Sequence, residues 1–492
     1  MNAPDIVHAS LKLAAPELLR QQCYIDGAWL DADDGKTLPV TNPATGALLG
    51  TVPSVGIAET RRAIEAANAA WPAWRARTAK ERSSILRKWQ DLMLANREDL
   101  AMLMTAEQGK PLSESRGEID YAASFIEWFS EEARRIYGDT IPAHQADKRI
   151  VVLKEPIGVC VAITPWNFPA AMITRKAGAA LAAGCTMVVK PASATPFSAL
   201  ALAALAERAG VPKGVFSVVT GSASVIGGEM TANPLVRKLS FTGSTETGRV
   251  LLEQCAATIK KTSMELGGNA PFIVFDDADL DAAADGAIIS KYRNAGQTCV
   301  CANRLLVQDA VYDAFAAKLV ERVRKFKVGN GMEPDVTIGP LIDQHAVAKV
   351  EEHIADARAR GAHVIEGGER HSLGGLFFQP TVLTGVDSTM QVAREETFGP
   401  VAPLFRFKDE AEAIRMANDT EFGLASYFYA RDLGRVWRVS EGLEYGMVGI
   451  NTGLISTAIA PFGGMKQSGL GREGSKYGVE DYLQVKYLCM AI

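Results

Sequence analysis

Two cysteines, separated by a single residue, lie in a segment whose composition is unusual for thiols of a protein core. The segment, Asn294-Ala295-Gly296-Gln297-Thr298-Cys299-Val300-Cys301-Ala302-Asn303-Arg304, is polar and contains glycine. Cysteine usually packs in a core as a small hydrophobe, whereas a glycine-containing loop lets the backbone approach a ligand closely. A nearby cation such as Arg293 favours the thiolate, which is the nucleophilic form. Cys299 is therefore a candidate nucleophile, and Cys301 is a candidate disulfide or metal partner.

Acyl chemistry at such a thiol also needs a general base and an oxyanion donor, and the sequence offers a carboxylate and an amide as candidates. Met264-Glu265-Leu266-Gly267-Gly268 places Glu265 among apolar residues and glycines, where partial burial would raise its pKa toward that of a general base. A surface Glu at a strand end is an equally acceptable interpretation. Trp166-Asn167-Phe168-Pro169 offers a side-chain amide as an oxyanion donor. A plain turn before a proline-started helix also explains Asn167.

A phosphate-binding segment is the third candidate. Phe241-Thr242-Gly243-Ser244-Thr245-Glu246-Thr247-Gly248 follows a predicted strand and opens a predicted helix, and a helix N-terminus attracts phosphate. An ordinary helix cap explains the segment equally well. Glu265 lies about 20 residues further on, where a ribose-binding acid is expected in dinucleotide sites, so two roles are open for it.

Neither a P-loop nor a metal centre is expected. The chain has no Gly-x-x-x-x-Gly-Lys-Ser/Thr pattern, its six His show no helical pair, and Cys299-x-Cys301 has no second Cys/His cluster.

The elements that must position these groups alternate between strands and helices from 149 to 266. Strands are predicted over 150–153, 159–164, 186–190, 215–219, 237–241 and 260–265, with helices over 169–183, 197–209, 222–230 and 245–257. This alternation predicts an open, mainly parallel sheet with ligands beyond its carboxyl edge. The segments after the strands should therefore meet there: 165–167, 190–191, 220–222, 242–244 and 266–268.

A second alternating region runs from 271 to 450 and contains Cys299. Its predicted strands are 271–275, 304–307, 363–365, 401–407, 426–429 and 447–451, and its predicted helices are 279–293, 311–325, 343–360, 409–418 and 432–442. Before both regions, helices are predicted over 58–70, 79–107 and 113–136. The segments 149–155 and 482–489 read as protruding strands, whose edges proteins usually pair or cover. We expect them to pair across subunits, which predicts a homo-oligomer.

The composition of the chain excludes some classes of function. The 492 residues imply several domains, and a net charge of −5 argues against nucleic acid as a partner. Seven widely spaced cysteines fit a reducing compartment. Residues 1–20 lack a charged-then-apolar leader pattern, and no apolar run is long enough to span a bilayer. We expect a cytoplasmic protein without a membrane partner.

Five motifs in order resemble the aldehyde dehydrogenase superfamily. They are Pro165-Trp166-Asn167-Phe168-Pro169, Phe241-Thr242-Gly243-Ser244, Met264-Glu265-Leu266-Gly267-Gly268, Gly296-Gln297-Thr298-Cys299 and Glu395-Glu396-Thr397-Phe398-Gly399-Pro400. The stretches 295–304, 453–456 and 461–478 are more specifically similar to its succinate-semialdehyde dehydrogenase group.

The resemblance implies a fold and a domain plan. It implies an α/β chain with a Rossmann-type cofactor domain over 21–137 and 158–267, an α/β catalytic domain over 268–472, and a small β oligomerisation arm from 138–157 and 473–492. A homotetramer or homodimer is implied.

The resemblance also implies roles for the candidate residues. Cys299 attacks the aldehyde, the Asn167 amide and the Cys299 N–H hold the oxyanion, and Glu265 activates water; the ribose-binding role of Glu265 is thereby disfavoured. Residues implied to bind the cofactor are Trp166, Gly243, Ser244, Glu396 and Phe398.

Cofactor and substrate preferences follow from further matching positions. Similar NAD-preferring enzymes often carry a Glu where Ser193 stands, so Ser193 with Lys190 implies that NADP is preferred and NAD accepted. Arg175, Arg293 and Ser456 match the carboxylate-binding positions of a semialdehyde. The implied substrate is succinic semialdehyde, as in GABA degradation, with glutarate semialdehyde as the alternative. Cys301 resembles the redox partner thiol of some members. The rival interpretations are a catalytically inactive binding protein and a Cys-x-Cys metal module.

Overall fold

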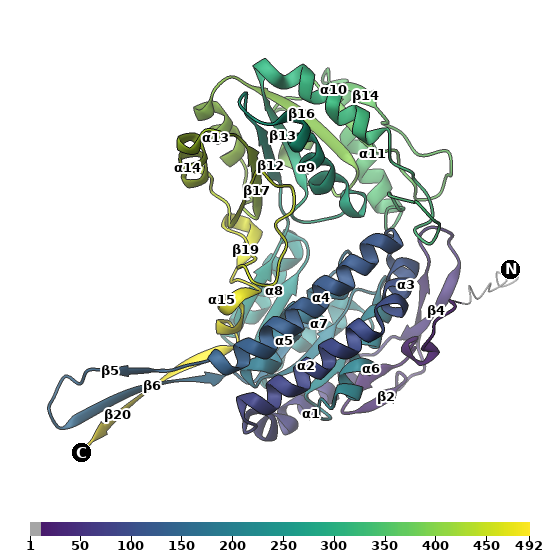
Figure 1. Cartoon of the computed structure of the whole chain (residues 1–492). Coiled ribbons are helices and arrows are strands. Elements are labelled where there is room, and N and C mark those ends of the chain that lie inside the picture. Colours follow the sequence, from purple (N-terminus) through teal and green to yellow (C-terminus); the bar gives the residue numbers. More distant parts are fainter. Residues whose placement is uncertain (1–10) are drawn as a thin grey trace, which may run out of the picture.

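The computed structural model describes residues 11–492 as two α/β lobes and a protruding β arm (Figure 1). The expected absence of a leader pattern concerns residues 1–20, of which 1–10 lie outside the described residues. No helix among residues 11–492 combines the length and the apolar composition that crossing a bilayer requires.

The first lobe is built on an eight-stranded sheet with the order β19-β11-β10-β7-β8-β9-β1-β2. Its parallel strands are β7 (Val159–Ile163), β8 (Thr186–Lys190), β9 (Phe216–Val218), β10 (Val236–Thr242) and β11 (Lys261–Glu265). The antiparallel edges are β1 (Cys23–Ile25) with β2 (Ala28–Leu30), and β19 (Gly469–Leu470). Chain order reverses at β7, which lies between β8 and β10, so ligands should bind beyond the carboxyl ends of β7 and β10.

Helices cover both faces of this sheet. One face carries α1 (Ile57–Arg75), α7 (Ala223–Ala232) and α8 (Thr245–Ala256), and the other carries α2 (Ala79–Ala95), α3 (Arg97–Gln108), α4 (Leu112–Glu132), α5 (Ala171–Ala183) and α6 (Pro196–Ala209). Alternate residues of β7 explain the two cores: Cys160 and Ala162 pack in one, and Val159, Val161 and Ile163 pack in the other.

The second lobe holds a seven-stranded sheet with the order β14-β15-β16-β13-β12-β17-β18. Its strands are β12 (Ala270–Val274), β13 (Ala302–Gln308), β14 (His363–Glu366), β15 (Thr381–Thr384), β16 (Val401–Phe407), β17 (Ala425–Tyr429) and β18 (Met447–Ile450). Its helices are α9 (Leu280–Tyr292), α10 (Tyr312–Val323), α11 (Gln344–Ala359), α12 (Gln391–Arg394), α13 (Glu410–Asn418) and α14 (Leu433–Gly442). The predicted α/β class with two sheets is confirmed.

The arm consists of β5 (Asp139–Ile141), β6 (Lys148–Pro156) and β20 (Leu483–Ala491) in the order β20-β6-β5. β20 and β6 pair antiparallel along their whole length, from Leu483 with Pro156 to Ala491 with Lys148. The sequence analysis did not anticipate that these two segments pair with each other, and the expected pairing across subunits stays a prediction for the outer edges of the arm. Within residues 11–492, the outer edges of β20 and β5 have no strand beside them.

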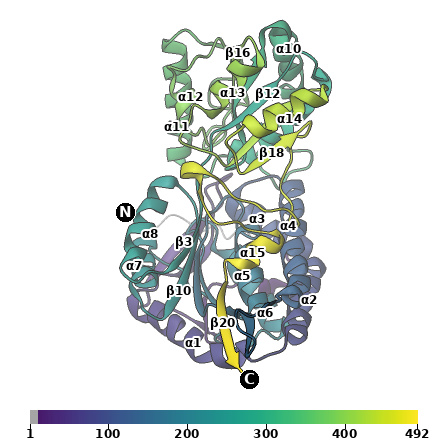
Figure 2. The ribbon, with the colours of Figure 1, turned by 90° about the vertical axis from the view of Figure 1, so that its left-hand side faces the viewer.

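The C-terminal segment joins the lobes. After β18 the chain runs from the second lobe to the first, where α15 (Ser475–Glu480) precedes β20 (Figure 2). β19 pairs with β11, Leu470 with Met264 and Gly469 with Glu265. The predicted catalytic segment 268–472 therefore includes a strand of the first sheet, which brings this segment next to Glu265.

Several element boundaries differ from the sequence prediction. The helix predicted over 79–107 divides at Asn96 into α2 and α3. The sequence analysis missed β15, β19, α12 and α15, which have two to six residues each, and it did not predict the N-terminal hairpin of β3 (Thr37–Thr41) and β4 (Leu48–Pro53).

Candidate active site

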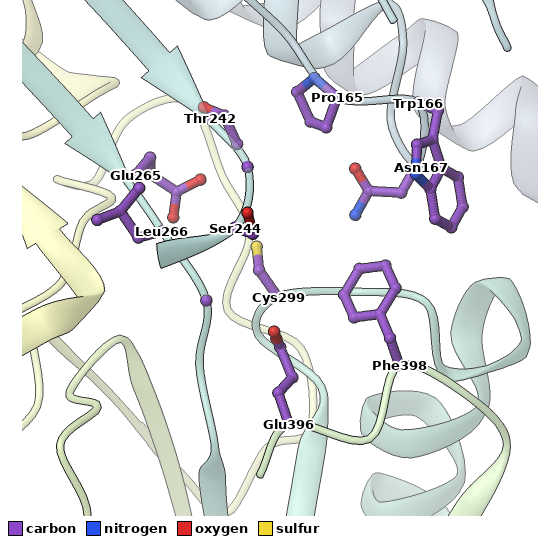
Figure 3. A pocket seen from close by; sticks show the side chains of 12 residues that line it. Pro165, Trp166, Asn167, Thr242, Ser244, Glu265, Leu266, Cys299, Glu396 and Phe398 are labelled. Atoms are coloured by element: carbon purple, nitrogen blue, oxygen red, sulfur yellow. The ribbon is translucent and has the colours of Figure 1, made fainter. Parts of the chain in front are cut away.

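A cavity of about 230 Å³ lies between the lobes, at the carboxyl ends of β7, β10 and β11 (Figure 3). The first lobe lines it with Trp166 and Asn167 after β7, Thr242 to Ser244 at the end of β10, and Glu265 to Gly267 at the end of β11. The second lobe adds Cys299, Glu396 and Phe398. Three of the five strand-end segments therefore converge here as predicted. Lys190 ends β8 at the same edge, where its carbonyl accepts a hydrogen bond from the Thr164 N–H at 3.1 Å.

The loop that carries Cys299 is held in an unusual backbone conformation. In η3 (Arg293–Gly296), Asn294 and Ala295 have φ of 52° and 54°, a left-handed region that non-glycine residues rarely adopt. Gly296 follows at φ 77°, and a Cβ there would lie 2.1 Å from the Gly399 carbonyl. The loop therefore depends on contacts from outside it.

Asn294 supplies many of these contacts. Its N–H donates to Glu114 Oε2 at 2.8 Å, its Oδ1 accepts from Gln108 Nε2 at 2.9 Å, and its Nδ2 donates to the Asn167 carbonyl at 3.2 Å. Asn tolerates the left-handed conformation better than most residues do. The α3–α4 region thus sets the position of the cysteine loop.

The oxyanion candidate Asn167 is fixed by the same network. Its Nδ2 donates to the Gln297 carbonyl at 3.1 Å, and its Oδ1 accepts from the Phe168 N–H. An amide NH₂ carries two hydrogens, so one stays available to the cavity. The Lys110 ammonium, which is buried with Glu118, donates to the Asn167 carbonyl at 2.6 Å.

The base candidate Glu265 is buried beside Arg175. Arg175 Nη2 donates to Glu265 Oε2 at 2.5 Å, and Glu265 Oε1 has no hydrogen-bond partner within residues 11–492. Burial raises the pKa of the Glu265 carboxyl, against the opposing effect of the Arg175 charge. The side chain is therefore suited to accepting a proton, as predicted for a partly buried strand-end carboxylate.

Burial also raises the pKa of the Cys299 thiol well above its ordinary value, and the Glu265 charge raises it further. The charges of Arg175 and Arg293 act in the opposite direction but do not outweigh burial. Arg293 therefore favours the thiolate, as the sequence analysis expected, but its effect on the pKa is smaller than that of burial. In the view of Figure 3, Cys299 lies between Glu265 and Asn167.

The other side of the cavity fits a dinucleotide. Trp166 and Phe398 pack edge to face with ring centroids 5.7 Å apart. Glu396 Oε1 accepts from the Gly268 N–H at 3.1 Å, and burial raises the pKa of Glu396 to about 8. Ser244 caps α8 by accepting from the Thr247 N–H. Gly243, Ser244 and the α8 N-terminus therefore face the same cavity as Glu396.

Lys190 and Ser193 do not line this cavity. Lys190 is buried at the end of β8, and within residues 11–492 its ammonium has no ion pair or side-chain hydrogen bond. Burial lowers its pKa to about 8. Ser193 is exposed three residues later. A buried cation without a partner is a suitable site for a phosphate.

The three candidate substrate-binding residues differ in their burial and in their contacts. Arg175 is fully buried and engaged by two carboxylates, Glu265 and Glu473. Arg293 is half-buried, stacks over Phe168 at 5.1 Å, and has no ion pair within residues 11–492. Ser456 is half-buried in the loop after β18. The roles of all three as substrate ligands stay predictions, and among the two arginines Arg293 is the available cation.

Three residues of this region were missed by the sequence analysis. Lys176, next to Arg175 on α5, contacts Glu473 at 2.6 Å, and Glu473 lies in the loop before α15. Tyr121 on α4 is half-buried with its hydroxyl unpartnered within the described chain, and burial of this hydroxyl raises its pKa to about 12 against the opposing charges of Arg175 and Arg293. Glu473 falls in the stretch 461–478 that carried the resemblance, but no local pattern marks Lys176 or Tyr121.

Cys301 does not line the cavity. It is buried, and its thiol donates to the Lys291 carbonyl at 3.2 Å. Both Cys299 and Cys301 are free thiols. Among residues 11–492, no three His, Cys, Asp or Glu side chains are grouped so as to hold a metal ion.

Comparisons with known proteins agree with this geometry. The model of the aldehyde dehydrogenase family matches residues 29–488. The chain is 72% identical to a glutarate-semialdehyde dehydrogenase of Pseudomonas aeruginosa over 98% of this chain and 99% of the relative. It is 70% identical to a succinate-semialdehyde dehydrogenase [NADP(+)] of Escherichia coli over 98% of this chain and 100% of the relative.

A solved structure, that of succinate-semialdehyde dehydrogenase from Burkholderia pseudomallei, superimposes with a TM-score of 0.97 at 68% identity. The match covers 98% of this chain and 100% of that one. Fold, site and sequence agree, and the chain belongs to the aldehyde dehydrogenase family.

Proposed function

We propose that the protein oxidises short aldehydes with a terminal carboxylate, succinic semialdehyde first, to the corresponding acids with NADP. The observation that carries this proposal is the meeting of Cys299, Asn167 and Glu265 around one cavity. Glutaric semialdehyde is the second candidate, since the chain is similar to enzymes named for each substrate. One methylene changes transition-state binding by only about 1–3 kcal/mol.

The residues divide the chemistry between them. Cys299 adds to the aldehyde carbon as thiolate, and the oxyanion accepts hydrogen bonds from the Asn167 amide and the Cys299 N–H. Each such donor contributes about 3 kcal/mol of transition-state stabilisation. The bound dinucleotide supplies the hydride acceptor. Glu265 then takes a proton from the water that attacks the thioester, and the acid leaves from Cys299.

Cofactor preference depends on Lys190 and Ser193. The buried Lys190 ammonium has no carboxylate partner within the described chain, and together with the Ser193 hydroxyl it would receive the 2′-phosphate of NADP. Glu396 would hold the nicotinamide ribose, and Gly243 and Ser244 would bind the pyrophosphate. Trp166 and Phe398 would lie beside the nicotinamide. NAD is expected as a slower cofactor.

The terminal carboxylate of the substrate is assigned to Arg293, Arg175 and Ser456. Arg293 supports this most directly, because it is half-buried and without an ion pair within residues 11–492. A guanidinium binds a carboxylate with two parallel hydrogen bonds.

Reduction of NADP and NAD should be followed by absorbance with succinic, glutaric and uncharged aldehydes. We expect the highest kcat/KM for a semialdehyde with NADP. Arg293→Ala should raise KM for the semialdehydes far more than for an uncharged aldehyde of equal length. Equal effects on both would remove the carboxylate site from the proposal, and a higher kcat/KM with NAD would refute the cofactor preference.

Reversible inactivation through a Cys299–Cys301 disulfide is a further part of this proposal. The two thiols are two residues apart, but Cys301 must first leave the Lys291 carbonyl. Peroxide inactivation that a thiol reductant reverses should disappear in Cys301→Ala. If it persists there unchanged, Cys301 is no redox partner.

We also propose a homodimer or homotetramer in the cytoplasm. Seven free cysteines fit a reducing compartment, which cell fractionation tests, and the oligomer is argued below from the arm.

A further inference from the structure

The side chain proposed as the base is bound to a cation in this structure. Arg175 Nη2 lies 2.5 Å from Glu265 Oε2, and the same guanidinium contacts Glu473 through Nε. Lys176 Nζ contacts the other oxygen of Glu473 at 2.6 Å. The side chains of Arg175 and Lys176 have no exposed surface, so two cations and two carboxylates form a buried, charge-balanced cluster.

The Arg175 guanidinium makes Glu265 a weaker base than burial alone would make it. The proton affinity of the carboxylate is reduced by the neighbouring positive charge, and one oxygen is already occupied by a donor. Phe462 covers Arg175, with the guanidinium carbon 4.6 Å from the ring centroid. Glu265 is therefore held in its present position by a side chain of α5.

Arg175 is also one of the residues assigned to the carboxylate of the substrate. The same Nη2 cannot make its short bond to Glu265 and serve a second carboxylate equally well. Binding of the substrate carboxylate at Arg175 would therefore place the base and the substrate in competition for one guanidinium.

We propose that Arg175 restrains Glu265 in the resting enzyme, and that the terminal carboxylate of the bound substrate takes the place of Glu265 on the guanidinium and so releases the base. This inference rests on the proposed function, because it concerns substrates with a terminal carboxylate. It makes Arg175 a positioning residue for Glu265 in addition to a substrate ligand.

The order of events follows from the chemistry. The carboxylate tail stays in place after the thioester forms, so Glu265 is free when hydrolysis begins. Glu265 accepts a proton from water, the water oxygen bonds to the acyl carbon, and the carbon–sulfur bond breaks with the pair leaving on Cys299. An acyl group without a carboxylate leaves Arg175 on Glu265, and its thioester is hydrolysed slowly. Specificity is then set at hydrolysis as well as at binding.

Other titratable groups around Glu265 belong to five segments of the chain. Arg175 and Lys176 come from α5, Glu473 from the loop before α15, and Tyr121 from α4. Cys299 and Glu396 come from the second lobe. Of these groups only Arg175 donates a hydrogen bond to the Glu265 carboxylate among the described residues, so its release is the step that changes the base.

The test uses Arg175→Gln in the full-length enzyme with NADP, and measures thioester hydrolysis after the rapid phase of cofactor reduction. With an uncharged aldehyde such as butanal, we expect hydrolysis to become severalfold faster than in the unaltered enzyme. With succinic semialdehyde, whose carboxylate already frees Glu265 in the unaltered enzyme, we expect little change in the rate of hydrolysis. Arg370→Gln, which removes a similar bidentate pair with Glu351 on the surface, should change neither rate. Slower hydrolysis of both substrates in Arg175→Gln would overturn the inference.

A measurement on the unaltered enzyme covers the case in which Arg175→Gln does not fold. The pH at which hydrolysis reaches half its maximum should be higher with succinic semialdehyde than with butanal, because only the former frees Glu265 from Arg175. Identical profiles would overturn the inference. Failure of the proposed function would give a different result, because the unaltered enzyme would then not prefer aldehydes that carry a carboxylate. The comparison of Arg175→Gln with the unaltered enzyme on butanal does not depend on that preference.

Discussion

At the scale of single residues, burial dominates the charges of the site. It raises the pKa of the Cys299 thiol and of the Glu265 carboxyl, raises that of Glu396 to about 8, and lowers that of Lys190 to about 8. The sequence analysis singled out Cys299, Glu265 and Asn167, which the structure brings to one cavity, but the pKa shifts follow from burial among distant segments, which local spacing does not encode. The thiol rests neutral, and the cation proposed for NADP titrates near neutral pH.

If Lys190 binds the 2′-phosphate as proposed, the cofactor preference should depend on pH. A lowered pKa means that the ammonium loses its proton as the pH rises through about 8, and the neutral amine attracts the 2′-phosphate less strongly. We expect kcat/KM for NADP to fall above pH 8 relative to that for NAD, since this parameter reports groups of the free enzyme. Lys190→Met should lower kcat/KM for NADP and remove the difference between the two pH profiles. Parallel profiles in the unaltered enzyme would show that Lys190 does not contact the phosphate.

At the scale of elements, the strand ends were predictable and the contacts between lobes were not. Parallel strands must end at one edge, so segments 165–167, 242–244 and 266–268 could be placed together from their order alone. The break at Asn96 was hidden, because Asn96 ends one helix and starts the next without any proline or glycine. The contacts of Arg175 with Glu265 and Glu473 join positions far apart in the chain, and no periodicity reveals them.

The loop before Cys299 gives a prediction at this scale. Asn294→Ala and Asn294→Gly both remove the amide that joins the loop to Asn167 and Gln108, but only glycine adopts φ near 52° without strain. We expect Asn294→Ala to lower the free energy of unfolding by about 1–2 kcal/mol more than Asn294→Gly does. Both variants should lose kcat. Denaturant unfolding of the two proteins side by side measures the difference, and equal stabilities would mean that the loop relaxes out of its left-handed conformation.

At the scale of the whole molecule, the arm is the part that the chain alone does not stabilise. β20 is exposed along nearly its whole length, with Val485 70% and Tyr487 57% exposed, and both faces of the strand are bare. A sheet of three strands without a covered hydrophobic face is marginal in water. The sequence analysis predicted pairing across subunits at these strands, and this stays a prediction for the outer edge of β20, because its other edge pairs with β6 within the chain.

The bare face and outer edge of β20 predict where subunits meet. Replacing both Val485 and Tyr487 with Glu should lower the oligomeric state measured by light scattering after size-exclusion chromatography, because like charges would be buried in the interface. Ile259→Glu, at an isolated residue that is 92% exposed, is the matched control and should leave the assembly unchanged. An unaltered protein that runs as a monomer would refute the oligomer.

The central claim is that Cys299 carries the acyl group and that Glu265 is needed to release it. Glu265→Gln should be mixed with succinic semialdehyde and NADP, the reduced cofactor counted against active chains, and Cys299 examined by peptide mass spectrometry. We expect one rapid turnover per site, then a near stop, with a succinyl group on the peptide that contains Cys299. Continued turnover at the rate of the unaltered enzyme, or an unmodified Cys299 after that first turnover, would contradict the account.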